Sequence, residues 1–416
     1  MRDVAKQPWN ASLTTKVTSA IQSLCSMATL VWGSVPLGLR EALVVYFTWR
    51  VPLILLLTFA QGNLPPGPAA HSSALEGLDS PLIAWHRWDS GWYVWIIRHG
   101  YGFIRPGSGN CQSSIAFFPL FPMLSRGLSR LGVPILLADV LIANVATVFA
   151  LWGLWGLARR FVPGEDGPRR ALIALLVFPT SIFLSAAYTE SLLLAFGTWA
   201  VLFFERRRAL PCALCAGAAA IARANGILLV ASLCVAAALR RQWMVLGLVT
   251  ICAGATLGGF CYYQRVRFGD PLAFLHAREC WGVVTSHPAE ALRSYVDGAV
   301  GGHQFEPWLD VLTAAWLVVA SVPIFARLGV VYGLFTLGTV MATVQSGQLW
   351  GMARIGMCAF PVYILLAQWT RRPRVALVLA FTGLSLLSME GYRFVNGYWV
   401  SELRSPRISY PAFSIC

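Results

Sequence analysis

The stretch VPILLADVLIANVATVFALWGLWGLARR, residues 133–160, is long and apolar and ends on two arginines. A helix needs about 20 predominantly apolar residues to cross a bilayer. Hydrophobic residues make up 57% of the 416 residues and charged residues only 12%, roughly half the charge of an ordinary soluble protein. We therefore predict an all-α integral membrane protein, because a helix satisfies its own backbone hydrogen bonds in lipid.

Further apolar runs on both sides of this stretch predict a polytopic helical bundle of about eleven transmembrane helices. The eleven runs are 41–61, 133–158, 171–187, 189–204, 209–222, 226–239, 243–263, 307–326, 329–346, 355–370 and 375–391. Several are shorter than a straight crossing needs, so we expect some helices to be kinked, broken or re-entrant. The chain is predicted to be one membrane domain, residues 1–416, with large polar loops at 62–132 and 264–306. Residues 1–40 show no short cleavable signal pattern, so the first span is expected to persist in the mature protein.

Short arginine clusters between the runs predict the orientation of the bundle. The chain has 32 Lys and Arg, of which only Lys6 and Lys16 are lysines, and a net charge of +14. If the spans alternate, the clusters share one face, which the positive-inside rule assigns to the cytoplasm. This placement fits topology signals and lipid headgroups, and no nucleic-acid partner is predicted. The clusters are Arg159–Arg160, Arg169–Arg170, Arg206–Arg208, Arg240–Arg241, Arg327 and Arg371–Arg374.

The same alternation gathers the unusual polar residues on the opposite, outer face. They are Asp89, Tyr188–Glu190, Arg223–Asn225, Phe268–Pro271 and Gln345–Arg354. Only spans and arginine clusters were used to place them, so their convergence independently predicts an outward-facing site carried by the outer loops.

Asp89 lies in the segment HRWDSGWY, residues 86–93, an acid among aromatic side chains. It can act as a general base toward an acceptor hydroxyl, with Trp92 as a wall that suits a sugar face. Equally, Asp89 can cap an interfacial helix whose Trp and Tyr residues lie at headgroup depth. The donors His86 and Arg87 favour a substrate site. His86 and Asp89 alone are too few ligands for a metal site, and none is predicted.

Two arginines in the outer turns are candidates for binding a phosphate group. Arg223 and Asn225 lie between two apolar runs, where an arginine near lipid needs an anionic partner, and guanidinium binds phosphate through two donors. Arg354 makes a similar case. The alternative is that Arg223 and Asn225 form a simple turn between two short helices.

Glu190 follows Tyr188 at the start of another run. It can bind substrate or pair with Arg223. The alternative is a first-turn acid that favours a helix N-terminus.

Cys212 and Cys215 have CxxC spacing, but they lie in an apolar run without a second pair, so we interpret them as packing residues rather than a metal or redox site. No phosphate-binding glycine loop or dinucleotide fingerprint occurs, and no cofactor is predicted. A sugar transferred on the outer face would then come from a lipid-linked donor, because nucleotide sugars are cytoplasmic.

Four ordered motifs between residues 85 and 230 resemble the PIG-V-type mannosyltransferases, polytopic enzymes of the GT-C glycosyltransferase class. Besides the Trp-Asp segment, they are Gly100–Tyr101 with Ala116–Pro122 (AFFPLFP), the pattern from Pro179 to Glu190 (PTSIFLSAAYTE), and Ala222–Gly226 (ARANG). The last third matches only loosely, through Gly269–Pro271 and Arg354–Pro361.

The resemblance implies an inverting mannosyltransferase with a polyprenyl-phosphate-mannose donor and a glycan or glycolipid acceptor. Asp89 would be the catalytic base, with His86, Arg87, Trp92, Tyr188, Glu190, Arg223, Asn225 and Arg354 binding substrate. Eukaryotic members act on the precursor of GPI anchors in the endoplasmic reticulum. The bias toward arginine over lysine indicates a high-GC bacterial genome, which predicts a bacterial plasma membrane, or the endoplasmic reticulum membrane if the chain is eukaryotic. It also argues against that anchor as the acceptor, and the site is expected on the non-cytoplasmic face.

Two competing classes explain part of the pattern. A transporter or flippase of a lipid-linked or amphipathic solute also has intramembrane arginines and broken helices, but no repeated halves are visible. A non-catalytic scaffold explains the spans but not the cluster of polar residues.

Overall fold

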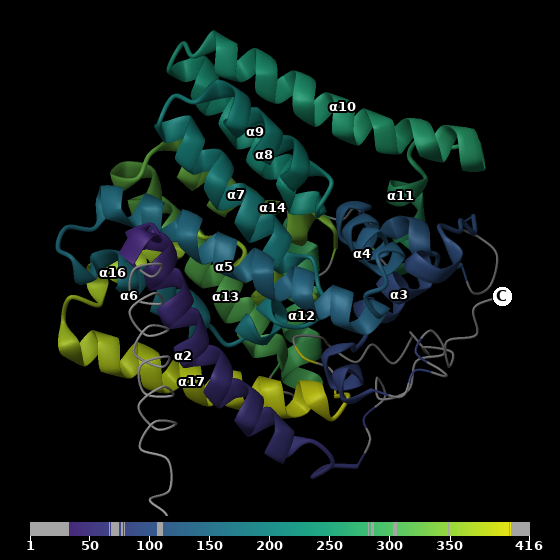
Figure 1. Ribbon diagram of the computed structural model, residues 1–416, viewed down its shortest axis with the longest axis horizontal. Helices are drawn as coiled ribbons and strands as arrows, with labels where there is room; N and C mark the ends of the chain where they lie inside the picture. Colours follow the sequence, from purple (N-terminus) through teal and green to yellow (C-terminus); the bar gives the residue numbers. More distant parts are fainter. Residues whose placement is uncertain are drawn as a thin grey trace, which may run out of the picture.

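The computed structural model describes residues 33–65, 67, 75, 78, 80–105, 111–281, 283, 287–302, 306–347, 349–398 and 400. Every regular element within these ranges is a helix, which confirms the all-α prediction (Figure 1). Five helices are long and apolar enough to cross a membrane. They are α2 (Leu37–Ala60), α5 (Ile135–Phe161), α10 (Trp243–Phe268), α13 (Glu306–Arg327) and α17 (Pro373–Val395).

Shorter helices complete the bundle and its two ends. The longest of them are α7 (Glu190–Glu205), α8 (Ala209–Ala220), α9 (Ala224–Leu239) and α14 (Val330–Gln345). The others are α3 (Asp89–His99), α4 (Leu120–Arg130), α6 (Asp166–Leu176), α11 (Ala273–His276), α12 (Pro288–Gly302), α15 (Met352–Met357) and α16 (Pro361–Trp369). Four 3-10 helices link them: η2 (Pro81–Trp85), η3 (Ser114–Ala116), η4 (Ser181–Leu184) and η5 (Ala277–Trp281).

Packing of α5, α7 and α8 forms the centre of the bundle, and α10 lies across α8 and α9 at its edge (Figure 1). The outer helices present apolar side chains outward at helical spacing, as Val44, Phe47, Val51 and Leu55 do on α2. Such an apolar surface suits contact with lipid, so the structure agrees with a multi-pass membrane protein.

Two of the predicted runs are broken helices rather than single crossings. Run 171–187 splits into α6 and η4, and the Ser181 hydroxyl donates to the Leu176 carbonyl across the break, at 2.6 Å. Run 355–370 splits into α15 and α16, where Pro361 begins a new helix. The number of eleven spans therefore stays a prediction, and most of residues 1–40 lies outside the described part of the chain.

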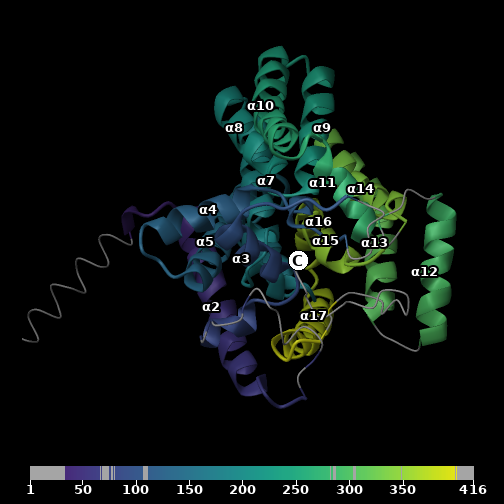
Figure 2. The same ribbon diagram turned by 90° about the vertical axis from the view of Figure 1, so that its right-hand side faces the viewer.

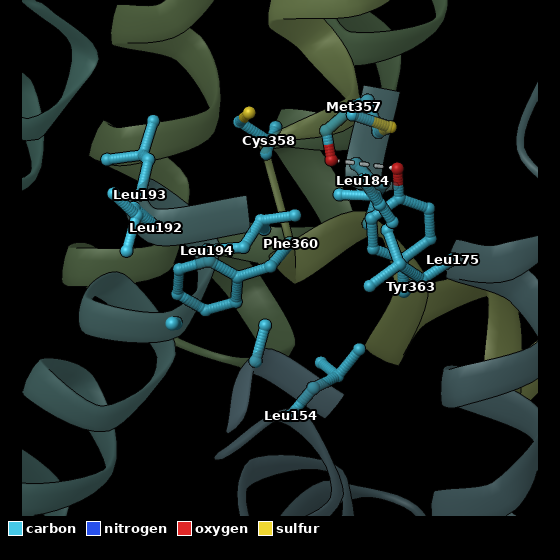
Figure 3. Close-up of a cluster of buried hydrophobic side chains, with 14 of the residues drawn as sticks. Leu154, Leu175, Leu184, Leu192, Leu193, Leu194, Met357, Cys358, Phe360 and Tyr363 are labelled. Atoms are coloured by element: carbon cyan, nitrogen blue, oxygen red, sulfur yellow. Dashed lines mark hydrogen bonds between the residues drawn. The ribbon is translucent and has the colours of Figure 1, made fainter. Parts of the chain in front are cut away.

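A buried cluster of apolar side chains surrounds the second break (Figure 3). Leu192, Leu193 and Leu194 of α7 enter it beside Phe360, which precedes α16. The Tyr363 hydroxyl donates to the Met357 carbonyl at 2.8 Å and so ties α16 back to α15. This packing fixes α15 at the end of the bundle where the outer loops lie.

The arginine-rich turns meet at one end of the bundle. The Glu205 carboxylate pairs with Arg160 at 3.2 Å and with Arg240 at 3.1 Å, joining the ends of α5, α7 and α9. Arg371 donates to the Pro163 carbonyl at 3.0 Å. The predicted separation of arginine clusters from the outer polar residues is therefore present in the fold, as two opposite ends of α7 and α9.

The two large polar segments carry their own helices. Segment 62–132 contains η2, α3, η3 and α4, and segment 264–306 contains α11, η5 and α12. Helix α12 stands at the side of the molecule, next to α13 and α14 (Figure 2). These elements position the site described next.

Candidate active site

Four charged side chains from four distant parts of the chain form one connected network. Arg354 Nη1 donates to Asp89 Oδ2 at 2.7 Å, and Arg354 Nε lies 3.4 Å from Glu190 Oε1. Arg223 Nη1 donates to the same Glu190 oxygen at 2.8 Å. Each of these residues was predicted from the sequence, and the structure brings all four together.

Asp89 is the first residue of α3, and the N-cap position is occupied by Trp88. The helix-cap interpretation of Asp89 is therefore wrong in its detail, although a first-turn carboxylate is still favoured by the helix dipole. Trp88 has a φ of 48°, which is unusual for a bulky residue. Its ring packs edge-on against Phe394, with centroids 5.1 Å apart. This buried ring holds the strained backbone that presents Asp89 to Arg354.

Glu190 is fully buried at the first residue of α7. Its Oε1 receives both arginines, whereas its Oε2 is buried without a hydrogen-bond partner among the described residues. A buried carboxylate oxygen without a donor is costly. The empty acceptor is therefore a place where a bound hydroxyl group can donate.

Gly226 explains the position of Arg223. A Cβ at Gly226 would overlap the backbone carbonyl of Ala219, so only glycine lets α9 begin this close to the end of α8. The Gly226 amide donates to the Arg223 carbonyl at 2.8 Å. Arg223, in extended backbone before α9, then reaches Thr189 and Glu190.

Arg354 is held by the backbone of the residue before it. The Ala353 amide donates to Asp310 Oδ1 at 2.7 Å, and the Thr180 hydroxyl donates to the Ala353 carbonyl at 3.0 Å. The guanidinium lies over the rings of Phe183 and Tyr188, 5.4 and 5.3 Å from their centroids. The break between α6 and α7 thus supplies the anchor and the aromatic floor for this arginine.

Aromatic rings form one side of the site. Trp92 is stacked on Phe117 of the AFFPLFP motif, with centroids 5.8 Å apart, and meets Trp281 edge-on at 5.6 Å. Tyr93 is buried beside the network and lies near Thr189. Burial first, and the Asp89 charge second, raise the pKa of Tyr93, so this phenol stays neutral.

Besides the aromatic residues Trp92 and Tyr188, three predicted residues lie outside the charged network. His86 is fully buried between the Leu82 carbonyl, at 2.9 Å, and Asp139, at 3.3 Å. Arg87 donates to the Val395 carbonyl at 2.7 Å, and burial lowers its pKa. Asn225 lies in the first turn of α9 and is 8% exposed. Their role in substrate binding stays a prediction, but the contacts of His86 and Arg87 join segments of the scaffold.

Tyr188 contacts both the surrounding scaffold and the charged network. Its hydroxyl donates to the Arg87 carbonyl at 2.8 Å, while its ring faces Arg354. The pattern from Pro179 to Glu190 therefore connects α3, α7 and α15.

The structure adds residues that sequence reasoning did not propose for the site. Tyr93 and Thr189 were visible within quoted motifs, but nothing in the sequence showed that they meet. Asp310 lies inside an apolar run, and a buried acid there is itself a signal of function or support. The structure also forms a disulfide, Cys111–Cys280, between the two large polar segments.

Among the described residues, no three His, Cys, Asp or Glu side chains are grouped closely enough to hold a metal ion. The two carboxylates and two guanidiniums of the network balance in charge. A carboxylate that can accept a proton, two arginines that can bind phosphate and aromatic walls are thus present within one site, a combination that suits group transfer from a phosphate-bearing donor.

An apolar cavity of about 920 Å³ opens between α4, α5, α7 and α8. Its lining includes Met123 and Leu128 of α4 and Leu192, Phe196 and Phe203 of α7. Two of these four helices begin near the charged network: α7 begins at Glu190, and the Leu120 amide of α4 donates to the Ile221 carbonyl, two residues before Arg223.

Residues 61–249 match the family described as "Mannosyltransferase (PIG-V)". A mouse protein named "GPI alpha-1,6-mannosyltransferase 2" is 32% identical over 186 residues, which are 40% of this chain and 34% of the relative. The rat protein of that name is 30% identical over 174 residues, 39% of this chain and 34% of the relative.

"GPI mannosyltransferase 2" of Schizosaccharomyces pombe is 26% identical over 150 residues, 35% of this chain and 30% of the relative. The chain thus spans about a third of the length of the curated relatives it matches. The matched segment holds Asp89, Glu190 and Arg223, so this part of the chain is similar to the PIG-V-type mannosyltransferases.

Proposed function

We propose that this protein is a membrane mannosyltransferase that moves mannose, with inversion, from a polyprenyl-phosphate donor to an acceptor hydroxyl. The observation that carries the proposal is the network of Asp89, Arg354, Glu190 and Arg223. In this network the Asp89 carboxylate and two guanidiniums lie within one site, at the N-terminal ends of α7 and α9.

Asp89 is the proposed base. Its Oδ2 is held by Arg354, and its Oδ1 makes no hydrogen bond to the described residues. The side chain keeps 24% exposure, so an acceptor hydroxyl can approach it. By donating to Oδ2, Arg354 fixes the orientation of the carboxylate, so that Oδ1 can face the acceptor hydroxyl.

One displacement then completes the transfer. The acceptor oxygen bonds to the anomeric carbon of mannose while the bond from that carbon to the phosphate oxygen breaks. The hydroxyl proton passes to Asp89, and the electron pair leaves on the polyprenyl phosphate, whose added negative charge Arg223 stabilises. A single displacement without a covalent intermediate inverts the anomeric centre.

The apolar cavity supports a lipid-linked donor. It is lined almost wholly by apolar groups, and both α4 and α7 lead from it to the charged residues. An isoprenoid chain in the cavity would place its phosphate near Arg223. The residues from Leu192 to Phe203 provide about 17 Å of helix along which such a chain can lie.

Two features support a site on the non-cytoplasmic face. The Cys111–Cys280 disulfide fits an oxidising compartment. The arginine-rich turns lie at the other end of the bundle, as the positive-inside rule requires for the cytoplasmic end. The relatives are named for mannose transfer to GPI, and we propose a glycolipid or glycan hydroxyl as the acceptor class here, without a metal cofactor.

The class of activity is tested by release of polyprenyl phosphate. Purified full-length protein is incubated with dolichyl- or undecaprenyl-phosphate mannose and a glycolipid extract, with and without EDTA. The proposal predicts release of polyprenyl phosphate in step with mannosylated lipid, unchanged by EDTA. Donor movement across proteoliposomes without release would instead support the flippase alternative.

A further inference from the structure

Two neighbouring turns at the arginine-rich end of the bundle close their helices in the same way. After α7 the backbone turns at Arg207, with a φ of 55°, and after α9 it turns at Arg241, with a φ of 53°. In each turn the next amide donates to the carbonyl five residues back, at 2.9 Å in the first turn and 2.8 Å in the second. This is the hydrogen bond of a Schellman motif, in which a left-handed residue closes the end of a helix.

The left-handed position of this motif favours glycine, because a Cβ there crowds the backbone. The chain follows that preference elsewhere: Gly132 after α4 and Gly397 after α17 occupy the same position, and their next amides donate five residues back at 3.2 and 3.0 Å. Among the described residues with positive φ, only Trp88, Arg207 and Arg241 are not glycine. The two arginines thus stand where glycine would be less strained, and retained strain of this kind indicates a function for the side chain.

A buried carboxylate joins the two turns. Glu205, whose side chain is only 3% exposed, accepts from Arg240 of the second turn at 3.1 Å and pairs with Arg160 at the end of α5 at 3.2 Å. Glu205 is the one acid in these three helix ends, which carry seven exposed arginines: Arg159, Arg160, Arg206, Arg207, Arg208, Arg240 and Arg241. Such an excess of positive charge attracts anions.

Exposed apolar side chains border both turns. Leu210 follows the first turn, and Leu239, Trp243 and Met244 flank the second; all four are more than half exposed. Membrane proteins place arginines beside tryptophan and aliphatic side chains at the level of the lipid headgroups. A soluble anion would gain nothing from this apolar border. A lipid offers a phosphate to the arginines and acyl chains to their apolar neighbours.

We propose that turns 206–208 and 240–242 together form a binding site for the phosphate of an anionic phospholipid. Glu205 sets the spacing of the turns, and Arg207 and Arg241 supply guanidiniums, each of which presents a planar fork of donors to phosphate oxygens. The site lies at the opposite end of α7 and α9 from Glu190 and Arg223, so it is separate from the proposed transfer reaction. In the orientation proposed above, the lipid belongs to the cytoplasmic leaflet.

Thermal unfolding of the purified full-length protein in neutral detergent, titrated with phosphatidylglycerol or phosphatidylcholine, tests this site. Phosphatidylglycerol should raise the melting temperature of the wild type far more than phosphatidylcholine does, and added salt should weaken the effect. Arg207→Gly/Arg241→Gly should bind phosphatidylglycerol about 25-fold more weakly, from about 5-fold for each arginine near an anionic surface. In phosphatidylcholine this variant should melt at the wild-type temperature or up to about 2 °C above it, because glycine relieves the left-handed backbone.

Two further variants separate charge from position. Arg207→Lys/Arg241→Lys keeps both positive charges in the same turns and should retain most of the affinity for phosphatidylglycerol. Arg265→Gln/Arg267→Gln removes two exposed arginines at the other end of α10 and should respond to phosphatidylglycerol as the wild type does.

Three results would overturn the proposal: an unchanged phosphatidylglycerol response in the glycine variant, an equal loss in the α10 control, or equal stabilisation of the wild type by soluble glycerol 3-phosphate. A glycine variant that melts well below the wild type in phosphatidylcholine would also overturn it, because the arginines would then serve the fold. Since no sugar is transferred in this assay, its result is independent of whether the protein proves to be a mannosyltransferase.

Discussion

At the scale of single residues, the sequence predicted the charged members of the site and offered the Glu190–Arg223 pair, but it did not show that Arg354 connects them to Asp89. Asp89, Glu190, Arg223 and Arg354 were selected as polar residues out of place in an apolar chain, and they meet in one network. His86 was selected as a donor beside Asp89, yet it is buried against Asp139. The direction in which a side chain points depends on tertiary packing, and a short sequence motif carries no information about that packing.

Glu190 holds two guanidiniums near each other, and its charge should be essential. Glu190→Gln keeps the shape but leaves Arg223 and Arg354 facing each other without the shared anion. We expect loss of mannosyl transfer and a loss of about 1–3 kcal/mol in stability, measured by thermal unfolding in detergent. Glu190→Gln/Arg223→Gln should regain part of that stability, and exposed Glu290→Gln should lose none. A double variant less stable than the single would contradict this account.

Tyr93 gives the protein a dependence on alkaline pH. The pKa of this phenol is raised from 10.0 by burial and by Asp89, whereas an unfolded chain titrates near 10. The unfolded state therefore loses its proton first, and the stability contributed below pH 10 declines as the pH rises above it, by about 1.4 kcal/mol per pH unit. Equilibrium unfolding between pH 9 and 11 should show a shallower decline for Tyr93→Phe. The exposed Tyr262→Phe should match the wild-type slope; equal slopes for all three proteins would rule out this role.

At the scale of helices, the apolar runs of the sequence predicted where most helices lie. They did not show at which residues a run is broken into two shorter helices. Run 133–158 appears as α5, but run 171–187 is α6 followed by the buried 3-10 helix η4. An apolar composition does not distinguish a crossing helix from a buried irregular segment, because both avoid water. Such a segment is tolerated at this depth because protein covers it and its polar groups find partners, as Thr180 does with Ala353.

The close start of α9 on α8 should make Gly226 indispensable. Gly226→Ala would force the first turn of α9 away from the Ala219 carbonyl and carry Arg223 away from Glu190. We expect reduced stability and a strong loss of transfer activity. Gly254→Ala, in α10 where an added Cβ meets nothing within 4 Å, should be neutral or stabilise by about 0.5–1 kcal/mol. Thermal unfolding and a turnover assay check both; full activity in Gly226→Ala would refute the packing argument.

At the scale of the whole molecule, the sequence correctly predicted that arginine clusters and outer polar residues lie at opposite ends. The contacts of Glu205 with Arg160 and Arg240 define one end, and the network around Glu190 defines the other. The link between the two polar segments was not predicted. The pairing of Cys111 with Cys280 among ten cysteines cannot be read from spacing, because 169 residues separate them.

The proposed orientation predicts where cysteines can be labelled. In intact cells, a membrane-impermeant maleimide should reach Cys111 and Cys280 after reduction. A cysteine introduced as Arg372→Cys, at the exposed start of α17, should react only in inverted vesicles. Labelling of Arg372→Cys from outside would reverse the assignment of the site to the non-cytoplasmic face.

The central claim is that Asp89 takes the proton from the acceptor hydroxyl. Its most direct measurement is the turnover of purified Asp89→Asn with polyprenyl-phosphate mannose and acceptor extract, beside the wild type and the exposed acid variant Asp297→Asn. The account predicts that Asp89→Asn lowers turnover by about 10²- to 10⁴-fold, the usual contribution of a general base, with donor affinity and thermal unfolding close to those of the wild type. Turnover retained near the wild-type rate in a folded, donor-binding Asp89→Asn protein would contradict it.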